Sequence, residues 1–186
     1  MAATDTSDPR VERSRAQLTD ALGVLLRTRD PRDISVSALC AEAGVSRPTF
    51  YQHFASLDDV AVAGVEGRFA RLRADLPDGP DVPYRLVTRW LEELDAERAS
   101  WQRTIGCGTA FASSRDAVET WLADRLAERA PAAGQTTVRY AAAGFLGVVR
   151  AWLREDAGPD RRSPEQLATD LAELSARVLG ATRLGC

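Results

Sequence analysis

The sequence predicts an all-α fold of about nine helices, in which a three-helix N-terminal head precedes a larger helical body. Apolar residues recur in alternating steps of three and four along most of the 186-residue chain, as they do on one face of a helix. Prolines, glycines and capping side chains separate these stretches. No run of alternating apolar and polar residues is bounded by turn signals, so we predict no strand.

The composition is typical of a globular protein that does not cross a membrane. Hydrophobic residues make up 45% of the chain and charged residues 27%. The longest stretch without a charge, residues 104–114, has eleven residues, against the roughly 20 that a membrane-spanning helix needs. The N-terminus lacks the basic start and the apolar centre of a secretory signal, so the expected compartment is the cytoplasm.

Cysteine and histidine are too sparse for a metal centre or a disulfide framework. The chain has three widely spaced cysteines, Cys40, Cys107 and Cys186, and a single histidine, His53. The metalloprotease, P-loop and Rossmann motifs are absent from the sequence. We therefore expect no catalytic residue, no metal, no cofactor and no enzymatic activity. Two alternatives stay open at this stage, namely Cys40 as a sensor thiol rather than a small buried residue, and His53 as a catalytic base.

Turn chemistry predicts two short helices in the first third of the chain. Ser35 can cap a helix over residues 35–43 that stops at Gly44, where glycine can adopt the left-handed conformation that ends helices. Ser46 can cap the next helix, over residues 47–54. The short connection between the two is typical of a helix-turn-helix, whose second helix enters the major groove of DNA.

The other helix boundaries follow the same chemistry. The first helix can begin at Asp8 and Pro9 and ends before Pro31. Ser56 with Asp59 is similar to a capping box. The clearest linker is residues 76–83, the loops lie at 131–134 and 157–160, and Ser163, Pro164 and Gln166 form a complete helix start.

Charge is divided unevenly between the head and the body. The net charge of −3 by itself argues against a nucleic-acid partner. Residues 10–53, however, hold seven arginines against five acidic residues, whereas residues 57–186 hold seventeen against twenty. The acidity therefore lies in the C-terminal two-thirds of the chain.

The run over residues 34–54 resembles the DNA-binding head of the tetracycline-repressor (TetR) family. The shared pattern is Ala43-Gly-Val-Ser, Thr49-Phe-Tyr and His53-Phe, in this order and spacing, within a match that covers about residues 10–62. The resemblance implies a homodimer that binds a palindromic operator in double-stranded DNA, and most commonly a repressor that a small molecule releases. It divides the chain into a disordered tail (1–9), a DNA-binding domain (10–56) and a ligand-binding and dimerisation domain (57–186).

The resemblance also assigns DNA contacts by position. Bases would be read near the front of the second short helix, while Tyr51 and His53 would hold the phosphate backbone. Two positions depart from the family pattern: Leu57 stands where a lysine usually contacts phosphate, and Cys40 stands where alanine is usual. The residues expected to contact DNA are Ser35, Ser46, Arg47, Pro48, Thr49, Tyr51, Gln52 and His53.

In the family, the region between residues 83 and 140 encloses a small-molecule pocket. Aromatic residues cluster here, and Gly106 and Gly108 would weaken a helix and leave space. We expect an apolar or aromatic effector, with the packing of these aromatics in an ordinary core as the alternative. The predicted lining residues are Trp90, Trp101, Thr104, Cys107, Phe111, Trp121 and Tyr140.

The last two helices, over about residues 136–155 and 164–181, carry apolar stripes that the resemblance assigns to a dimer of the chain. Packing within the chain is the alternative explanation. The residues predicted at or near the two-fold interface are Phe145, Val149, Trp152, Leu171 and Leu174.

Three rival functions remain open at this point. One is an activator or a DNA-binding regulator without a small-molecule effector. A helical enzyme fits poorly with the missing metalloprotease, P-loop and Rossmann motifs. A structural scaffold fits poorly with the polar side chains on an exposed helix over residues 47–53.

Overall fold

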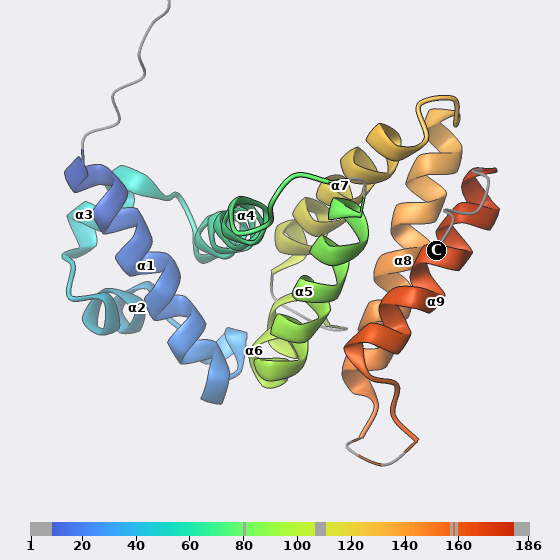
Figure 1. The fold of residues 1–186 in the computed structure, drawn as a ribbon. Helices are drawn as coiled ribbons and strands as arrows, with labels where there is room; N and C mark the ends of the chain where they lie inside the picture. Colours follow the sequence, from blue (N-terminus) through green and yellow to red (C-terminus); the bar gives the residue numbers. More distant parts are fainter. Residues whose placement is uncertain (1–8, 80, 107–110, 157, 159, 181–186) are drawn as a thin grey trace, which may run out of the picture.

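The computed structural model describes residues 9–79, 81–106, 111–156, 158 and 160–180, and this part of the chain contains nine α-helices, one 3-10 helix and no strand. The all-α prediction is therefore confirmed. Figure 1 shows a small helical head beside a larger helical body. In chain order the helices are α1 (Pro9–Thr28), η1 (Pro31–Asp33), α2 (Val36–Ala43), α3 (Arg47–His53), α4 (Leu57–Ala74), α5 (Val82–Ala96), α6 (Arg98–Ile105), α7 (Ala112–Arg129), α8 (Gln135–Arg154) and α9 (Pro164–Leu179).

The predicted caps form as expected. The side chains of Ser35, Ser46, Ser56 and Ser163 each accept the backbone N–H three residues further on, and Gly44 ends α2 with φ at 67°. These contacts satisfy donors that the first turn of a helix leaves without partners. Of the predicted tail, only the last residue is described, and it begins α1.

Helix α4 lies between the head and the body. Helices α1, α2 and α3 are on one side of it and α5 to α9 on the other (Figure 1). Val60 and Ala61, near its start, belong to the head core, whereas Val65, Phe69 and Leu72 belong to the body core. Because one continuous helix takes part in both cores, a displacement of α4 changes the packing of both.

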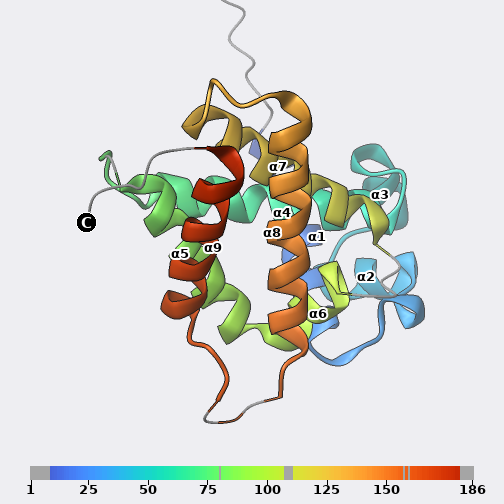
Figure 2. The ribbon, with the colours of Figure 1, turned by 90° about the vertical axis from the view of Figure 1, so that its right-hand side faces the viewer.

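The outer layer of the body consists of α8 and α9. Figure 2 shows these two helices side by side, with α4, α7 and the head helices behind them. Their buried residues, among them Val149, Trp152 and Leu167, pack into the body core. The opposite side of this layer is the surface furthest from the head (Figure 1).

Two negative findings apply to the described residues. None of their helices combines the length and the apolarity that crossing a bilayer requires. Nor do three of their His, Cys, Asp or Glu side chains gather where they could hold a metal ion.

Candidate nucleic-acid interface

Helix α3 rests on a small apolar core. Leu39 of α2 and Phe50 of α3 are fully buried, and Phe54, directly after α3, is nearly so. The turn between the two helices is closed by a backbone hydrogen bond of 3.0 Å from Val45 N–H to the carbonyl oxygen of Cys40. The helix-turn-helix layout is thus present, with Phe50 on the buried face of its second helix.

Four of the residues predicted to contact DNA form the exposed face of α3. Arg47, Pro48, Tyr51 and Gln52 are exposed, and Tyr51 keeps 54% of its surface accessible. Positions i, i+1, i+4 and i+5 share one side of a helix. A guanidinium, a phenol and an amide therefore stand on the surface of a helix whose opposite side is fixed.

The other predicted contacts have structural partners within the head. The hydroxyls of Ser35 and Ser46 cap α2 and α3 by accepting backbone N–H groups. Ser46 Oγ also lies 2.7 Å from the hydroxyl of Thr49. His53 is half-buried at the last position of α3. For all eight residues the contact with DNA stays a prediction.

Arg15 of α1, which the sequence reasoning missed, fixes the end of α3. Its Nη1 donates to the carbonyl oxygen of His53 at 3.1 Å, and its guanidinium lies 4.5 Å from the ring centre of Phe54. Because a helix leaves its last carbonyl groups without partners, this bond closes the C-terminal end of α3. The bonded residues are 38 positions apart in the chain, and no local pattern marks such a pair.

Carboxylates surround the start of α4, where the family pattern has a lysine. Leu57 is half-buried against the head core. Asp59 accepts two backbone N–H groups from the turn before the helix, and Asp58 Oδ2 accepts the N–H of Ser113 in α7 at 3.3 Å. Negative charge near a helix N-terminus is stabilising for the helix, but here it also repels a phosphate that approaches the same end.

The comparison with known proteins identifies the family of this head. Residues 18–63, which run from α1 into α4, match the family described as bacterial regulatory proteins, tetR family. The head of this chain belongs to the TetR family. A curated relative, the HTH-type transcriptional regulator EthR of Mycolicibacterium smegmatis, is 32% identical over 102 residues, which are 52% of this chain and 47% of the relative. The match thus spans about half the length of that protein.

Two solved structures share the helical arrangement of nearly the whole chain. The dihydroxyacetone kinase operon activator DhaS has a TM-score of 0.63 at 18% identity, over 92% of this chain and 98% of its own. The TetR family repressor AlkX from Dietzia sp., implicated in the biodegradation of n-alkanes, has a TM-score of 0.56 at 20% identity, over 89% and 95% of the two chains. At these identities the likeness concerns the fold alone.

Two of the aromatic residues predicted to line an effector cavity, Trp90 and Trp121, pack in the body core. Phe69 stacks on Trp121 with ring centres 3.8 Å apart. Trp90 lies 5.6 Å from Phe69 and 6.4 Å from Phe145. Rings at these separations are in packing contact, so no space for a ring-bearing guest lies between these four side chains. The prediction of an open aromatic cavity around Trp90 and Trp121 is therefore corrected.

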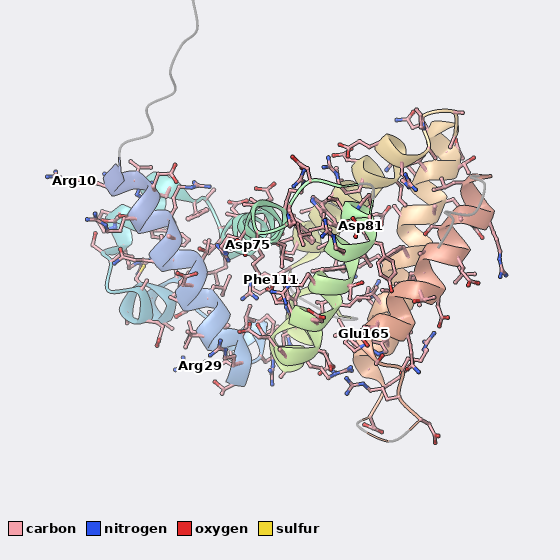
Figure 3. The ribbon with its side chains drawn as sticks, in the orientation of Figure 1. Arg10, Arg29, Asp75, Asp81, Phe111 and Glu165 are labelled. Atoms are coloured by element: carbon pink, nitrogen blue, oxygen red, sulfur yellow. The ribbon has the colours of Figure 1, made fainter. Side chains whose placement is uncertain are left out.

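Two more of the predicted lining residues lie elsewhere. Phe111, directly before α7, is buried in the head core (Figure 3), and Tyr140, on the outer side of α8, is 71% exposed. Cys107 lies outside the described residues. Aromatic residues that are close in the sequence therefore lie in separate parts of the structure.

Trp101 and Thr104 do reach a cavity, but a small one between the head and the body. It measures about 30 Å³ and is formed by α1, α4 and α6, with Gly64 and Arg68 among its other lining residues. A space of this size holds a small number of water molecules.

The predicted dimer residues are mostly internal. Phe145, Val149, Trp152 and Leu171 are buried in the chain's own core, and of the five only Leu174, 47% exposed, reaches the surface. Steps of three and four mark the apolar face of a helix but not the molecule that covers it. In α8 and α9 that face packs inside the chain, so the assignment of these four residues to an interface is corrected.

The outward side of α8 is formed by small residues and one aromatic. Ala143, Gly144 and Gly147 are exposed there, and a Cβ built at either glycine meets nothing within 4 Å. Tyr140 stands on the same surface. Small residues allow a second helix to approach closely, so this surface is suited to contact with another α-helix.

The short helix α6 attaches the head to the body. Arg103 Nη1 donates to the carbonyl oxygens of Leu26 and Arg27, at 2.9 and 3.0 Å, and so closes the C-terminal end of α1. At the start of α6, Glu97 pairs with Arg27 at 2.6 Å and with Arg68 at 3.2 Å. Burial raises the pKa of Glu97, but the two guanidinium groups outweigh it and hold that pKa below its ordinary value.

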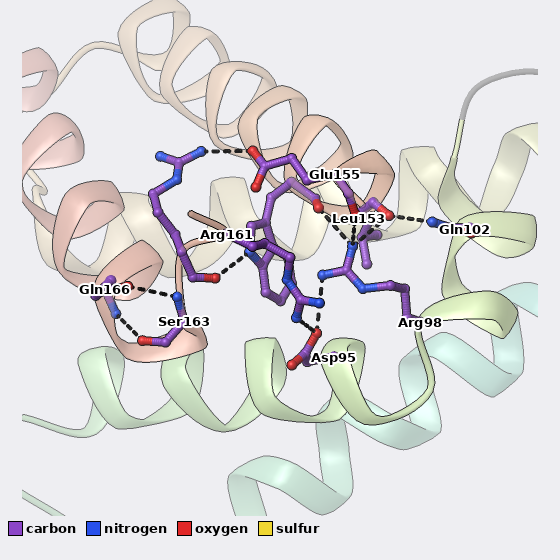
Figure 4. A network of polar contacts seen from close by, with 10 residues as sticks. Asp95, Arg98, Gln102, Leu153, Glu155, Arg161, Ser163 and Gln166 are labelled. Atoms are coloured by element: carbon purple, nitrogen blue, oxygen red, sulfur yellow. Dashed lines mark hydrogen bonds and ion pairs between the residues drawn. The ribbon is translucent and has the colours of Figure 1, made fainter. Parts of the chain in front are cut away.

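The same helix closes the C-terminal end of α8 (Figure 4). Arg98 Nη1 donates to the carbonyl oxygens of Trp152 and Leu153, at 2.8 and 2.7 Å, and Gln102 also donates to the carbonyl oxygen of Leu153. Eight residues of α6 therefore join the last turn of a head helix to the last turn of an outer body helix.

Proposed function

We propose that this chain is a transcriptional regulator that binds double-stranded DNA through α3. The observation that carries the proposal is the exposed face of Arg47, Pro48, Tyr51 and Gln52 on a helix that is buried on its other side and fixed at its end. In a helix-turn-helix this face lies in the major groove, where arginine can bond guanine twice and glutamine can bond adenine. In this proposal residues 10–56 form the DNA-binding domain.

Within the DNA-binding domain, two kinds of contact are proposed. Arg47, Pro48, Thr49 and Gln52 read bases, and Pro48 and the methyl group of Thr49 pack against thymine methyls. Contacts that set the register without reading sequence come from Ser35, Ser46, Tyr51 and His53 to the phosphate backbone.

The regulator is proposed to act as a homodimer on a palindromic operator. A helix-turn-helix dimer reads two half-sites about 34 Å apart, one turn of DNA. The outward side of α8, with Ala143, Gly144 and Gly147, supports close packing against a second copy, and the exposed Leu174 of α9 adds apolar surface to it. Residues 57–186 would then form the dimerisation and ligand-binding domain.

The regulation is proposed to be repression that a small apolar or aromatic effector relieves. A ligand that binds better to one spacing of the two heads shifts the population towards that spacing and so changes DNA affinity. The bonds of α6 to α1 and α8 support such coupling, because a shift of α6 strains the end of a head helix and the end of an outer body helix together.

The alternative is an activator, or a DNA-binding regulator without an effector. The closed packing of Phe69, Trp90 and Trp121 favours a chain without a ligand site. Promoter fusions with and without the gene separate repression from activation, because the two predict opposite changes in expression.

Selection of bound duplexes from random DNA by the purified chain tests the proposal. We expect enrichment of an inverted repeat, and loss of preference at one base pair per half-site in Arg47→Ala. Arg177→Ala, in the last turn of α9, is the control and should select the same repeat. The proposed function would be refuted if the unaltered chain enriched no sequence or had no affinity for duplex DNA.

A further inference from the structure

One aromatic residue of the body is buried in the core of the head. Phe111, directly before α7, is 2% exposed and packs in the head core, whose other buried members all lie within residues 18–61. Among the described residues it is the only member of that core that follows α4 in the chain. Because a buried aromatic ring removes a large apolar area from water, Phe111 fixes the start of α7 to the head.

A hydrogen bond close to Phe111 joins the same two parts of the chain. Asp58, in the first turn of α4, accepts the backbone N–H of Ser113 through Oδ2 at 3.3 Å. A helix leaves the N–H groups of its first turn without partners, and the N-cap residue of α7, Phe111, has no side-chain oxygen to accept them. Asp58 therefore caps α7 from the helix that begins shortly after α3 ends.

The body holds the head at two separate places. Ser113 lines the same surface groove as His53, the last residue of α3. Arg103 of α6 instead closes the C-terminal end of α1, and Figure 1 shows α1 running from beside α3 to beside α6. One attachment is thus at the end of the head that carries α3, and the other is at the opposite end. Two separated attachments block a pivot that either one by itself allows.

We propose that Phe111 is a positioning residue that fixes the orientation of the head, so that the dimer accepts operators with only one separation of the two half-sites. This inference rests on the proposed DNA-binding function and concerns its selectivity for spacing. Phe111 is buried and contacts no base. Two binding modules joined by a stiff link reach one separation, whereas a flexible link lets them reach several separations at lower affinity.

The first test measures the loss of affinity when the spacing changes. The probes are the inverted repeat that the unaltered chain selects from random duplexes and versions with one base pair inserted or removed between the half-sites. One base pair turns a half-site by about 35° around the DNA axis, so the affinity of the unaltered chain should fall about tenfold. In Phe111→Ala this loss should shrink to about twofold, while the affinity for the selected repeat itself also falls.

Two control variants in the head core separate positioning from stability. Phe111→Leu keeps an apolar side chain in that core and should retain the loss of affinity at changed spacing. Leu18→Ala removes a fully buried side chain of α1 from the same core. It should lower the stability of the head and weaken binding to every spacing alike, so that the selectivity for spacing persists.

Asp58 offers an independent pair of variants. Asp58→Ala and Asp58→Asn both remove a negative charge close to the proposed DNA surface, but only Asp58→Asn keeps an oxygen that accepts the N–H of Ser113. The selectivity for spacing should therefore weaken in Asp58→Ala and persist in Asp58→Asn. If Phe111→Ala does not fold, this pair decides the question.

A measurement without DNA tests the attachment itself. In the unaltered chain, ¹⁵N relaxation should give the helices of the head and of the body equal order parameters. In Phe111→Ala the order parameters should be lower throughout the head, because its helices then move relative to the body. Unchanged order parameters in this variant would overturn the inference.

Three results on DNA would also overturn it. These are equal affinity of the unaltered chain for all spacings, selectivity in Phe111→Ala as strong as in the unaltered chain, and an equal loss of selectivity in Leu18→Ala. Each of them leaves the proposed DNA binding in place. A chain that binds no duplex refutes the proposed function instead, and the order parameters then decide whether Phe111 holds the head.

Discussion

The guanidinium of Arg15 donates to the carbonyl oxygen of His53 at 3.1 Å, so that α1 closes the C-terminal end of α3. The same guanidinium covers the ring of Phe54. Through this contact the head holds the direction of α3, whose exposed face is the proposed reading surface. A residue that contacts no base therefore controls where the reading side chains point.

Arg15→Ala should weaken binding to all duplexes without changing base preference. It removes a charge-assisted hydrogen bond and a cation–π contact, which together contribute about 1–3 kcal/mol to the stability of the head. Urea unfolding measures the stability, and isotherms on operator and scrambled DNA measure the affinity. Arg13→Ala, an exposed position of α1, is the control. A changed preference at a single base pair in Arg15→Ala would show that Arg15 itself reads DNA.

Arg47→Ala and His53→Ala should have different effects on DNA recognition. Loss of a base contact by Arg47 should cost about 1–3 kcal/mol on the operator and relax preference at one base pair. Loss of a backbone contact by His53 should weaken operator and scrambled DNA alike. Binding isotherms on both duplexes at several salt concentrations measure the two effects. The reverse result, with base preference changed only in His53→Ala, would contradict the roles assigned along α3.

Leu57→Lys should strengthen binding to any duplex. The new ammonium group is expected to neutralise a phosphate and to steepen the dependence of log affinity on log salt by about one unit. Asp58 and Asp59 lie beside it and reduce the gain in affinity. The methylene stem of lysine can still cover the apolar surface that Leu57 covers. Leu57→Met is the uncharged control, and an unchanged salt slope in Leu57→Lys would place this position away from DNA.

Gly144→Arg should convert the proposed dimer into monomers that remain folded. A side chain at Gly144 meets nothing within 4 Å in the chain and improves helix propensity, so the charge affects only the surface facing a second copy. Light scattering at micromolar concentration measures the mass, with Ala127→Arg on α7 as the control. Trp152→Glu should instead unfold the chain, because Trp152 is fully buried. A dimer of Gly144→Arg would place the interface elsewhere.

The attachment of the head should weaken in acid through Glu97. Since Arg27 and Arg68 hold the pKa of Glu97 below its ordinary value in the folded chain, the unfolded chain takes up the proton first as the pH falls. The contribution of Glu97 to stability is therefore complete above the ordinary pKa and is lost as the pH falls through the lower folded value. In Glu97→Gln the urea midpoint should depend less on pH over this range. Glu66→Gln, exposed on α4, should leave the pH dependence of the midpoint unchanged. The same pH dependence in both variants would contradict the role of Glu97.

Helix positions and the helix-turn-helix could be predicted from the sequence by itself. Ser35, Gly44 and Ser46 determine where α2 ends and α3 begins, because capping hydrogen bonds and the left-handed glycine act between residues within a few positions of each other. The exposed side of α3 follows from Phe50 in the same way, since helix geometry sets which neighbours share its buried face.

Only the tertiary structure decided what covers each apolar face. The stripes of α8 and α9 are equally suited to a partner chain and to the chain's own core. Trp152 and Leu171 are internal because α5, α6 and α7 of the same chain pack against α8 and α9. Phe111 is buried in the head core and Tyr140 is exposed at the surface, and these positions also depend on how the helices pack together. Burial, and contacts such as that of Arg15 with His53, depend on packing between segments that are far apart in the chain. A local sequence pattern does not say which distant segment packs against it.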